Sequence, residues 1–247
     1  MAPAAPSPAV TALVRALERA RAMHAARAQN PILAGALERL SDWQSRRLAV
    51  TYADLARDPR YAEAIGFFQS DLYGPQDFSR RDADLARVVP MMARMLPEGV
   101  MMTVAKAMEL SALSHELDMR VNDFLPRADA QFAVEDYCRA FRRAGHLAER
   151  RQQIELIGEV GLALDRAVGK PLVRSALALM HAPARAAGLG ELQTFLERGF
   201  AAFRRMRGAE AFLATIRERE TAIVDTIFDG GNAPFAEPPL KRRSASG

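Results

Sequence analysis

The sequence predicts an all-α protein, a compact bundle of about eight or nine helices with no sheet. Apolar residues recur at spacings of three and four along most of the chain, as Tyr61, Ile65 and Phe68 do. No run of alternating polar and apolar residues is long enough to indicate a strand. The pairs Asn30-Pro31 and Asp58-Pro59 place an N-cap residue before a proline, which is typical of a helix start.

The helices expected in the first part of the chain are 9–29, 31–57, 61–72 and 79–97. Gly74-Pro75 ends the third, because proline has no backbone N–H and restricts the residue before it. Ser79, with Asp82 three residues later, resembles a capping box that begins the fourth helix, and Asp77 is a rival N-cap. Pro90 is expected to kink or interrupt this fourth helix.

The helices expected in the second part are 99–124, 130–144 with a continuation to 168 that Gly145 either joins or interrupts, 172–181, 190–206 and 209–228. Pro126 ends the first of these, and Pro183 is expected to lie beyond the end of the helix over 172–181. The last helix is expected to turn Ile216 and Ile223 inward and the charged run Arg217–Glu220 outward.

Residues 9–228 form a single helical domain in this interpretation, and a division into two subdomains near residue 127 is the alternative. Residues 1–8 are rich in proline and alanine, and residues 229–247 are rich in glycine and proline and end in a basic tail. Both ends are expected to be disordered.

Charged residues gather at the corner between the third and fourth expected helices. They are Asp71, Asp77, Arg80, Arg81, Asp82, Asp84 and Arg87. In one interpretation, arginines and aspartates pair there and hold two helices at a fixed angle. In the other, Tyr73 and the arginines line a polar binding pocket at the corner.

The segment FFQSDLYGPQDFSRRD, which enters this corner, resembles the signature of the bacterial FFLEELY-motif proteins, a family of unknown function. Phe67 and Phe68 match the phenylalanine pair of the motif, and Leu72 and Tyr73 match its final leucine and tyrosine. The run Gln69–Asp71 departs from the motif, which has a leucine and two glutamates there. The resemblance covers about Arg47 to Met206 and implies no activity, cofactor or catalytic residue.

A long helix over 99–124 would place His115 on a methionine-rich face, with Glu109 and Glu116 on a neighbouring line. Acids and a histidine on a bundle helix are also found in carboxylate-bridged metal sites. Those sites need a Glu-x-x-His spacing, whereas Glu109 and His115 are six residues apart. A hydrogen-bonded core histidine is therefore favoured, and no metal site is predicted.

Several classes of protein are excluded by composition. No apolar run has the length of a membrane span. The single cysteine, Cys138, cannot form an internal disulfide and argues for the reducing cytoplasm. Lys241, Arg242 and Arg243 provide three of the four net positive charges, so the rest of the chain is nearly neutral and nucleic-acid binding is not favoured.

Three functions stay open at this point. The favoured one is a module that binds a protein or a small molecule through its helical surface or a central pocket, with Tyr73, Arg80, Arg81 and Arg87 as candidate residues. The second is an enzyme or cofactor carrier that uses Tyr73, Asp77, Glu109 and His115 inside the bundle, with an unspecified cofactor. The third is DNA or RNA binding through the basic tail and the arginine-rich helices. Neither a reaction nor an oligomeric state follows from the sequence.

Overall fold

The computed structural model describes residues 5–72, 78–126 and 132–239. Within these segments the chain forms eleven α-helices and one π-helix, and no strand. The all-α prediction is confirmed, with more helices than expected. One reason is that Tyr52 separates two helices within the expected range 31–57, where the backbone leaves the helical conformation (φ −113°, ψ 22°).

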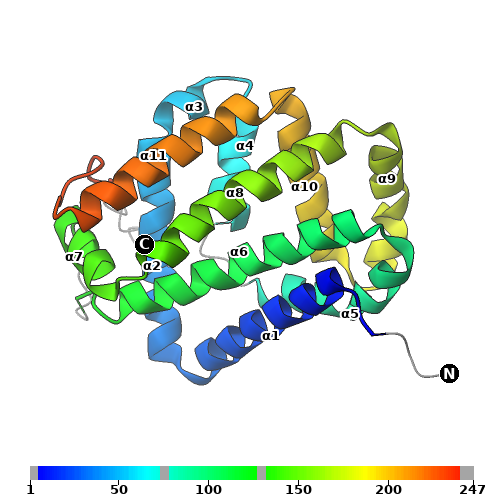
Figure 1. The fold of residues 1–247 in the computed structure, drawn as a ribbon, viewed down its shortest axis with the longest axis horizontal. Coiled ribbons are helices and arrows are strands. Elements are labelled where there is room, and N and C mark those ends of the chain that lie inside the picture. The colour runs from blue at the N-terminus through cyan, green and yellow to red at the C-terminus, as the bar shows by residue number, and fades with distance from the viewer. Residues whose placement is uncertain (1–4, 73–77, 127–131, 240–247) are drawn as a thin grey trace, which may run out of the picture.

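The elements of the first part are α1 (Pro8–Gln29), α2 (Pro31–Thr51), α3 (Ala53–Arg57), α4 (Ala62–Phe67), the π-helix η1 (Phe68–Leu72), α5 (Ser79–Met95) and α6 (Glu98–Asn122). Those of the second part are α7 (Val134–Ala144), α8 (Leu147–Val168), α9 (Pro171–Ala186), α10 (Gly190–Met206) and α11 (Glu210–Phe228). Figure 1 shows α1 lying along α6, α8 packed between α6 and α11, and α2 crossing behind these long helices.

Helix starts follow local chemistry in some places and tertiary contacts in others. At the start of α2, the Asn30 side chain accepts a hydrogen bond from the Leu33 N–H at 3.1 Å, as the sequence indicates. Asp58 instead caps a turn, through the Arg60 N–H at 2.8 Å, before α4 begins at Ala62. The capping box expected at Ser79 is wrong, because Phe78 is the N-cap residue of α5 and the Asp82 carboxylate contacts Arg81 and His24, at 3.2 and 3.0 Å.

Two prolines lie inside helices. Pro90 lies within α5, and Pro183 lies within α9 rather than beyond its end. A proline removes its own N–H from the helical ladder and crowds the carbonyl four residues earlier, but the hydrogen bonds on either side keep both helices continuous, so Pro90 does not interrupt α5.

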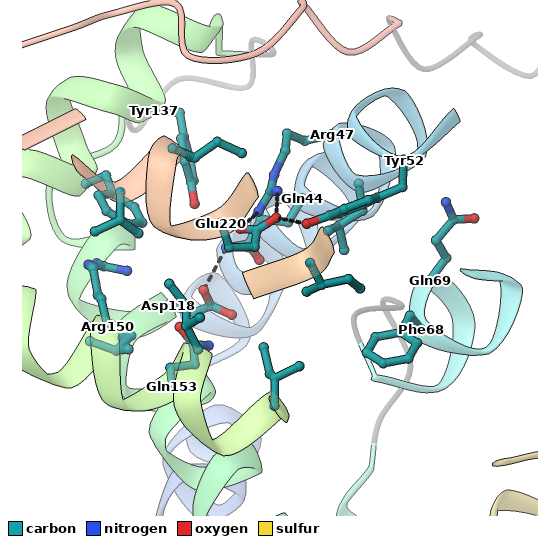
Figure 2. Close-up of a pocket in the computed structure, with 18 of the residues that line it drawn as sticks. Gln44, Arg47, Tyr52, Phe68, Gln69, Asp118, Tyr137, Arg150, Gln153 and Glu220 are labelled. Carbon is teal, nitrogen blue, oxygen red and sulfur yellow. Dashed lines mark hydrogen bonds and ion pairs between the residues drawn. The ribbon is translucent and has the colours of Figure 1, made fainter. Parts of the chain in front are cut away.

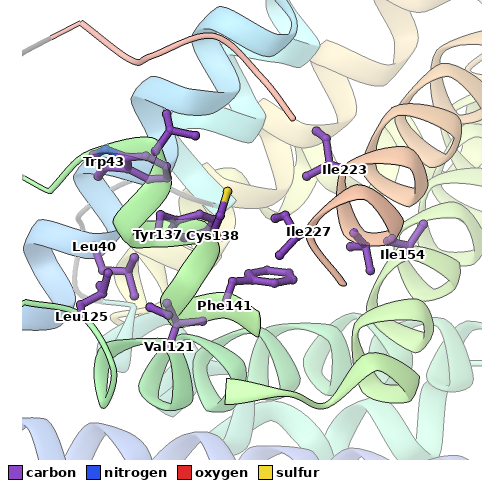
Figure 3. Close-up of a cluster of buried hydrophobic side chains, with 13 residues drawn as sticks. Leu40, Trp43, Val121, Leu125, Tyr137, Cys138, Phe141, Ile154, Ile223 and Ile227 are labelled. Carbon is purple, nitrogen blue, oxygen red and sulfur yellow. The ribbon is translucent and has the colours of Figure 1, made fainter. Parts of the chain in front are cut away.

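One apolar cluster joins helices from both ends of the chain (Figure 3). We call it the first cluster, and its largest members are Leu40, Trp43, Val121, Leu125, Tyr137, Phe141, Ile154, Ile223 and Ile227. Trp43 stacks on Tyr137 with ring centroids 4.5 Å apart. These residues come from both sides of residue 127, so the first cluster contains side chains from both halves of the chain.

A second cluster lies around Phe212, and a third packs α1 against α5 and α6. The second cluster includes Leu48, Tyr52, Ile65, Phe67, Phe203, Phe212 and Ile216. The third includes Leu13, Leu17, Leu85, Val89, Met101 and Met108. In the second cluster Phe67 lies against Gly199, where an added Cβ would be 3.1 Å from the ring. Close approach of α4 and α10 therefore depends on the missing side chain.

The C-terminal segment takes part in packing as far as the structure describes it. Phe235 lies against Trp43, with 6.0 Å between ring centroids, and the Glu237 carboxylate accepts a hydrogen bond from the Val134 N–H at 3.1 Å. Residues 240–247, which hold the basic end of the predicted tail, lie outside the described residues. No helix in the described segments is both long enough and apolar enough to cross a membrane.

Candidate functional site

A cavity of about 80 Å³ lies inside the bundle, where the first and second clusters meet (Figure 2). We call it the interior cavity. Apolar residues of both clusters, such as Ile154 and Ile216, form part of its wall. Its main polar lining residues are Gln44, Arg47, Asp118, Tyr137, Arg150 and Glu220. They come from five helices, so the bundle has to fold before these groups meet.

Arg47 and Glu220 form a buried ion pair on one side of this cavity. Nη1 and Nη2 of Arg47 donate to the two Glu220 carboxylate oxygens at 2.6 and 3.2 Å, and the Tyr52 hydroxyl donates to one of these oxygens at 2.6 Å. The Arg47 pKa is raised, because attraction to Glu220 and a hydrogen bond with it outweigh the cost of burial. This pair holds α2 to α11.

Asp118, on α6, faces the cavity from below in Figure 2. Its carboxylate accepts a hydrogen bond from the Gln44 amide at 2.7 Å. Burial raises the Asp118 pKa despite this hydrogen bond and the nearby positive charges of Arg150 and Arg27. The charged form of Asp118 is therefore costly in the folded protein.

Arg150, on α8, is the least compensated charge of the site. The residue is only 4% exposed. Its Nε donates to the Gly145 carbonyl at 3.2 Å, and its guanidinium carbon lies 3.4 Å from the centre of the Phe141 ring. Its Nη2 is buried with no hydrogen-bond partner among the described residues. Burial lowers the Arg150 pKa, although a guanidinium keeps its proton in proteins.

The segment that resembles the FFLEELY motif forms part of the cavity wall. Phe68 and Gln69, both in η1, line the cavity, and Figure 2 shows Phe68 on the side opposite Arg150. The twin phenylalanines thus have different surroundings, since Phe67 packs towards Phe195 and Gly199. Short π-helices are rare and often lie at functional sites.

A second pocket lies at the corner between η1 and α5. We call it the corner pocket. It has a volume of about 520 Å³ and is bordered by Arg80, Arg81, Arg185 and Arg198, together with Asp71 and Glu191. The structure therefore brings together two of the predicted site residues, Arg80 and Arg81. Tyr73 and Asp77 lie outside the described residues.

Most of the corner charges are compensated by neighbouring groups. Arg81 is stacked between Phe78 and Phe195, with its guanidinium carbon 4.4 and 4.6 Å from the ring centres, and it pairs with Asp82 at 3.2 Å. Arg198 pairs with Asp71 at 2.9 Å.

The outermost charges of the corner are paired in the same way. Arg80 pairs with Glu191 at 3.3 Å. Arg87 pairs with Asp84 at 3.3 Å and donates to the Ala187 carbonyl at 3.2 Å, outside the lining of the corner pocket. The arginine–aspartate pairs among the predicted corner residues thus lie within α5, whereas the pairs that join two elements are Arg80 with Glu191, between α5 and α10, and Arg198 with Asp71, between α10 and η1.

Glu109 and His115 do not join either pocket. The Glu109 carboxylate accepts a hydrogen bond from the Gln152 amide at 3.0 Å. Nδ1 of His115 lies 2.7 Å from the Ser111 carbonyl and must carry the proton, since a carbonyl oxygen only accepts. Within the described segments no three His, Cys, Asp or Glu side chains are placed to hold a metal ion.

Cys138 lies in the first cluster, next to the site. Burial raises the pKa of its thiol to about 11. The reactive thiolate is therefore scarce near neutral pH, and a nucleophilic role for Cys138 has no support in this geometry.

The sequence does not identify the polar residues of the interior cavity in advance, and the predicted outward orientation of Glu220 is wrong. Glu220 was expected on the outer face of the last helix, yet it lies three and four residues from the inward-facing Ile223 and Ile216. Arg47 and Arg150 lie similarly four residues from Trp43 and Ile154. A charged residue on an apolar helix face is the signal that could have identified all three.

Comparison with known proteins gives a family without an activity. A family model described as "Domain of unknown function (DUF8198)" matches residues 23–234. No curated protein and no solved structure matches the chain.

Proposed function

This chain belongs to the DUF8198 family of unknown function, and we propose that it is a binding protein that takes a small polar ligand into its interior cavity. The observation that carries this proposal concerns Arg150, a residue that lines the cavity and whose buried Nη2 has no hydrogen-bond partner among the described residues. A buried charged donor is costly unless a partner compensates it. A ligand in the cavity would supply that partner.

The lining of the cavity supports ligand binding rather than simple core packing. Small-molecule sites are mainly apolar and contain a few polar groups whose positions are fixed. The interior cavity has this composition, and the pair between Arg47 and Glu220 keeps its polar side in place. Perturbed titration of buried groups is also more frequent at functional sites, and the Asp118 pKa is raised by burial.

The corner pocket supports a binding function less well. Its volume is suited to a small ligand. However, Arg80, Arg81 and Arg198 already have carboxylate partners within 3.3 Å. A ligand that binds these three arginines would compete with their existing ion pairs, whereas a ligand at Arg150 would compensate a buried donor that has no partner among the described residues.

Filling the cavity tests the proposal. Val224 lines the cavity and is buried, so Val224→Phe should occupy part of the space and abolish binding of small polar molecules. Binding is measured by ligand-observed NMR with a set of small acids, amides and alcohols. Val14→Phe is the matched control, because Val14 lies on α1 outside the cavity and is 39% exposed.

The wild-type protein and Val14→Phe should bind the same members of the set. Overpacking by Val224→Phe costs roughly 1–3 kcal/mol, so its fold is checked by circular dichroism before binding is compared. Unchanged binding in a folded Val224→Phe variant would place the ligand elsewhere and contradict the proposal.

A further inference from the structure

We propose that the ligand of the interior cavity is a small planar oxyanion, such as a one- or two-carbon carboxylate, bicarbonate or nitrate, held by the guanidinium of Arg150. This inference rests on the proposed function and adds the chemical class of the ligand. It follows from the charges around the cavity, the orientation of Arg150 and the size of the space.

The charges around the cavity leave one cation without a partner. The cavity is lined by two arginines, Arg47 and Arg150, and by two acidic residues, Asp118 and Glu220. Glu220 is occupied by two donors of Arg47 and by the Tyr52 hydroxyl. Asp118 accepts a hydrogen bond from Gln44 and attracts Arg150 electrostatically, but no hydrogen bond joins Asp118 to Arg150 in the described segments. The charge of Arg150 is therefore the one that a ligand can compensate.

The orientation of Arg150 suits a planar acceptor. Its guanidinium stacks over Phe141, which occupies one of its two faces. A stacked guanidinium presents its N–H donors at its edge, in the geometry that a carboxylate accepts. Arg47 Nε is a second buried donor without a partner among the described residues. The cavity therefore has unpaired hydrogen-bond donors, which a ligand with acceptor oxygens can bind.

The size of the cavity limits the ligand to a few atoms. A volume of about 80 Å³ is roughly half that of an engineered cavity of about 150 Å³ that binds benzene. By this comparison the ligand has about three or four non-hydrogen atoms. Formate, acetate, nitrate and bicarbonate have this size, whereas sugars, nucleotides and amino acids are too large.

Titration calorimetry with the full chain tests this assignment. Sodium formate, acetate, nitrate and bicarbonate are titrated at constant ionic strength, with acetamide as the uncharged analogue of acetate. The tightest dissociation constant for a ligand of about four atoms is on the order of tens of micromolar, so titrations should reach about 10 mM. At least one oxyanion should bind, and acetamide should bind at least tenfold more weakly. The ranking separates a carboxylate from an inorganic ion.

Arg150→Met removes the charge and keeps an apolar side chain of similar reach. The variant should fold, because it replaces a buried charge that has no carboxylate bound to it, and its affinity for the oxyanion should fall at least tenfold. Arg151→Met is the matched control, since Arg151 is exposed and pairs with Asp225. Its affinity should stay within twofold of the wild-type value.

Three results would overturn the assignment. Acetamide that binds as well as acetate would reject the oxyanion class and leave small-ligand binding intact. Equal loss of affinity in Arg150→Met and Arg151→Met would reject the role of Arg150. If no oxyanion binds to the wild-type protein, the assignment is wrong, and the NMR comparison with Val224→Phe decides separately whether the cavity binds another class. Should Arg150→Met fail to fold, the acetate and acetamide titrations of the wild-type protein still decide.

Discussion

The interior cavity and the corner pocket use the same residue types in different surroundings. At the corner, Arg80 and Glu191 pair at the surface, where their side chains are 73% and 50% exposed. In the cavity, Arg47 and Glu220 pair with side chains that are 10% and 15% exposed, and Arg150 is buried as well. Water can hydrate this outer pair of the corner, whereas the cavity charges depend on each other. Pairing of arginine with a carboxylate therefore occurs in both places, but only the cavity has an arginine, Arg150, whose buried Nη2 has no hydrogen-bond partner among the described residues.

The two regions also differ in what holds them in place. The corner is built mainly by α5 and α10 together with η1, and stacking of Arg81 between Phe78 and Phe195 fixes its centre. The cavity depends on five helices and on the pair between Arg47 and Glu220. A change in the cavity should therefore affect the whole bundle, and a change at the edge of the corner should affect little else.

The largest effect is expected for Glu220→Gln. This substitution leaves the buried Arg47 charge without its carboxylate, which should lower the free energy of unfolding by about 3 kcal/mol. Chemical denaturation followed by circular dichroism measures the change. Glu218→Gln, two residues earlier on α11 and exposed, should change stability by less than about 0.5 kcal/mol. If both variants lose similar free energy of unfolding, the buried pair contributes no more to stability than an exposed charge.

A smaller effect of opposite sign is expected for Asp118→Asn. The folded protein holds the Asp118 proton to a higher pH than the unfolded chain, because burial raises this pKa above the ordinary value of 3.8. Asp118 therefore destabilises the fold as the pH rises through its folded-state pKa. At pH 7 the asparagine variant should melt at a higher temperature, and the difference should vanish below pH 3.8. A lower melting temperature at pH 7 would contradict this account.

The smallest effect is expected for Arg80→Ala at the corner. Its exposed pair with Glu191 should contribute about 0.5 kcal/mol or less. Arg81→Ala should cost clearly more, since it removes the stacked guanidinium between two aromatic rings and its pair with Asp82. Thermal denaturation of both variants measures the contrast. If Arg80→Ala and Arg81→Ala lower the melting temperature equally, the buried charge of the corner contributes no more to stability than the exposed one.

The sequence predicted the helices well because their signals are local. Asn30-Pro31 begins α2 where expected, and the regular spacing of apolar residues identified the long helices α6, α8 and α11. Prediction from the sequence failed where a residue distant in sequence binds a side chain that was expected to cap its own helix. Asp82 matches a capping pattern, but His24, 58 positions away in sequence, binds its carboxylate instead.

The candidate site was predicted only in part, for a related reason. Arg80 and Arg81 are adjacent in sequence and line one pocket. Arg47, Arg150 and Glu220 are far apart in sequence, and each looks like a surface charge when its helix is considered alone. Glu220 shows this most clearly, because the charged run Arg217–Glu220 hides that its last member lies on the buried face.

The sequence by itself determined that this chain is all-helical, where most helices begin and end, and that a charged corner follows the twin phenylalanines. Tertiary structure alone decided that the corner charges pair with each other and that Arg47, Asp118, Arg150 and Glu220 meet around one cavity. Helix formation depends on contacts three or four residues apart, which a sequence displays directly. The balance of buried charge depends on which helices pack together, and that is set only when the bundle closes.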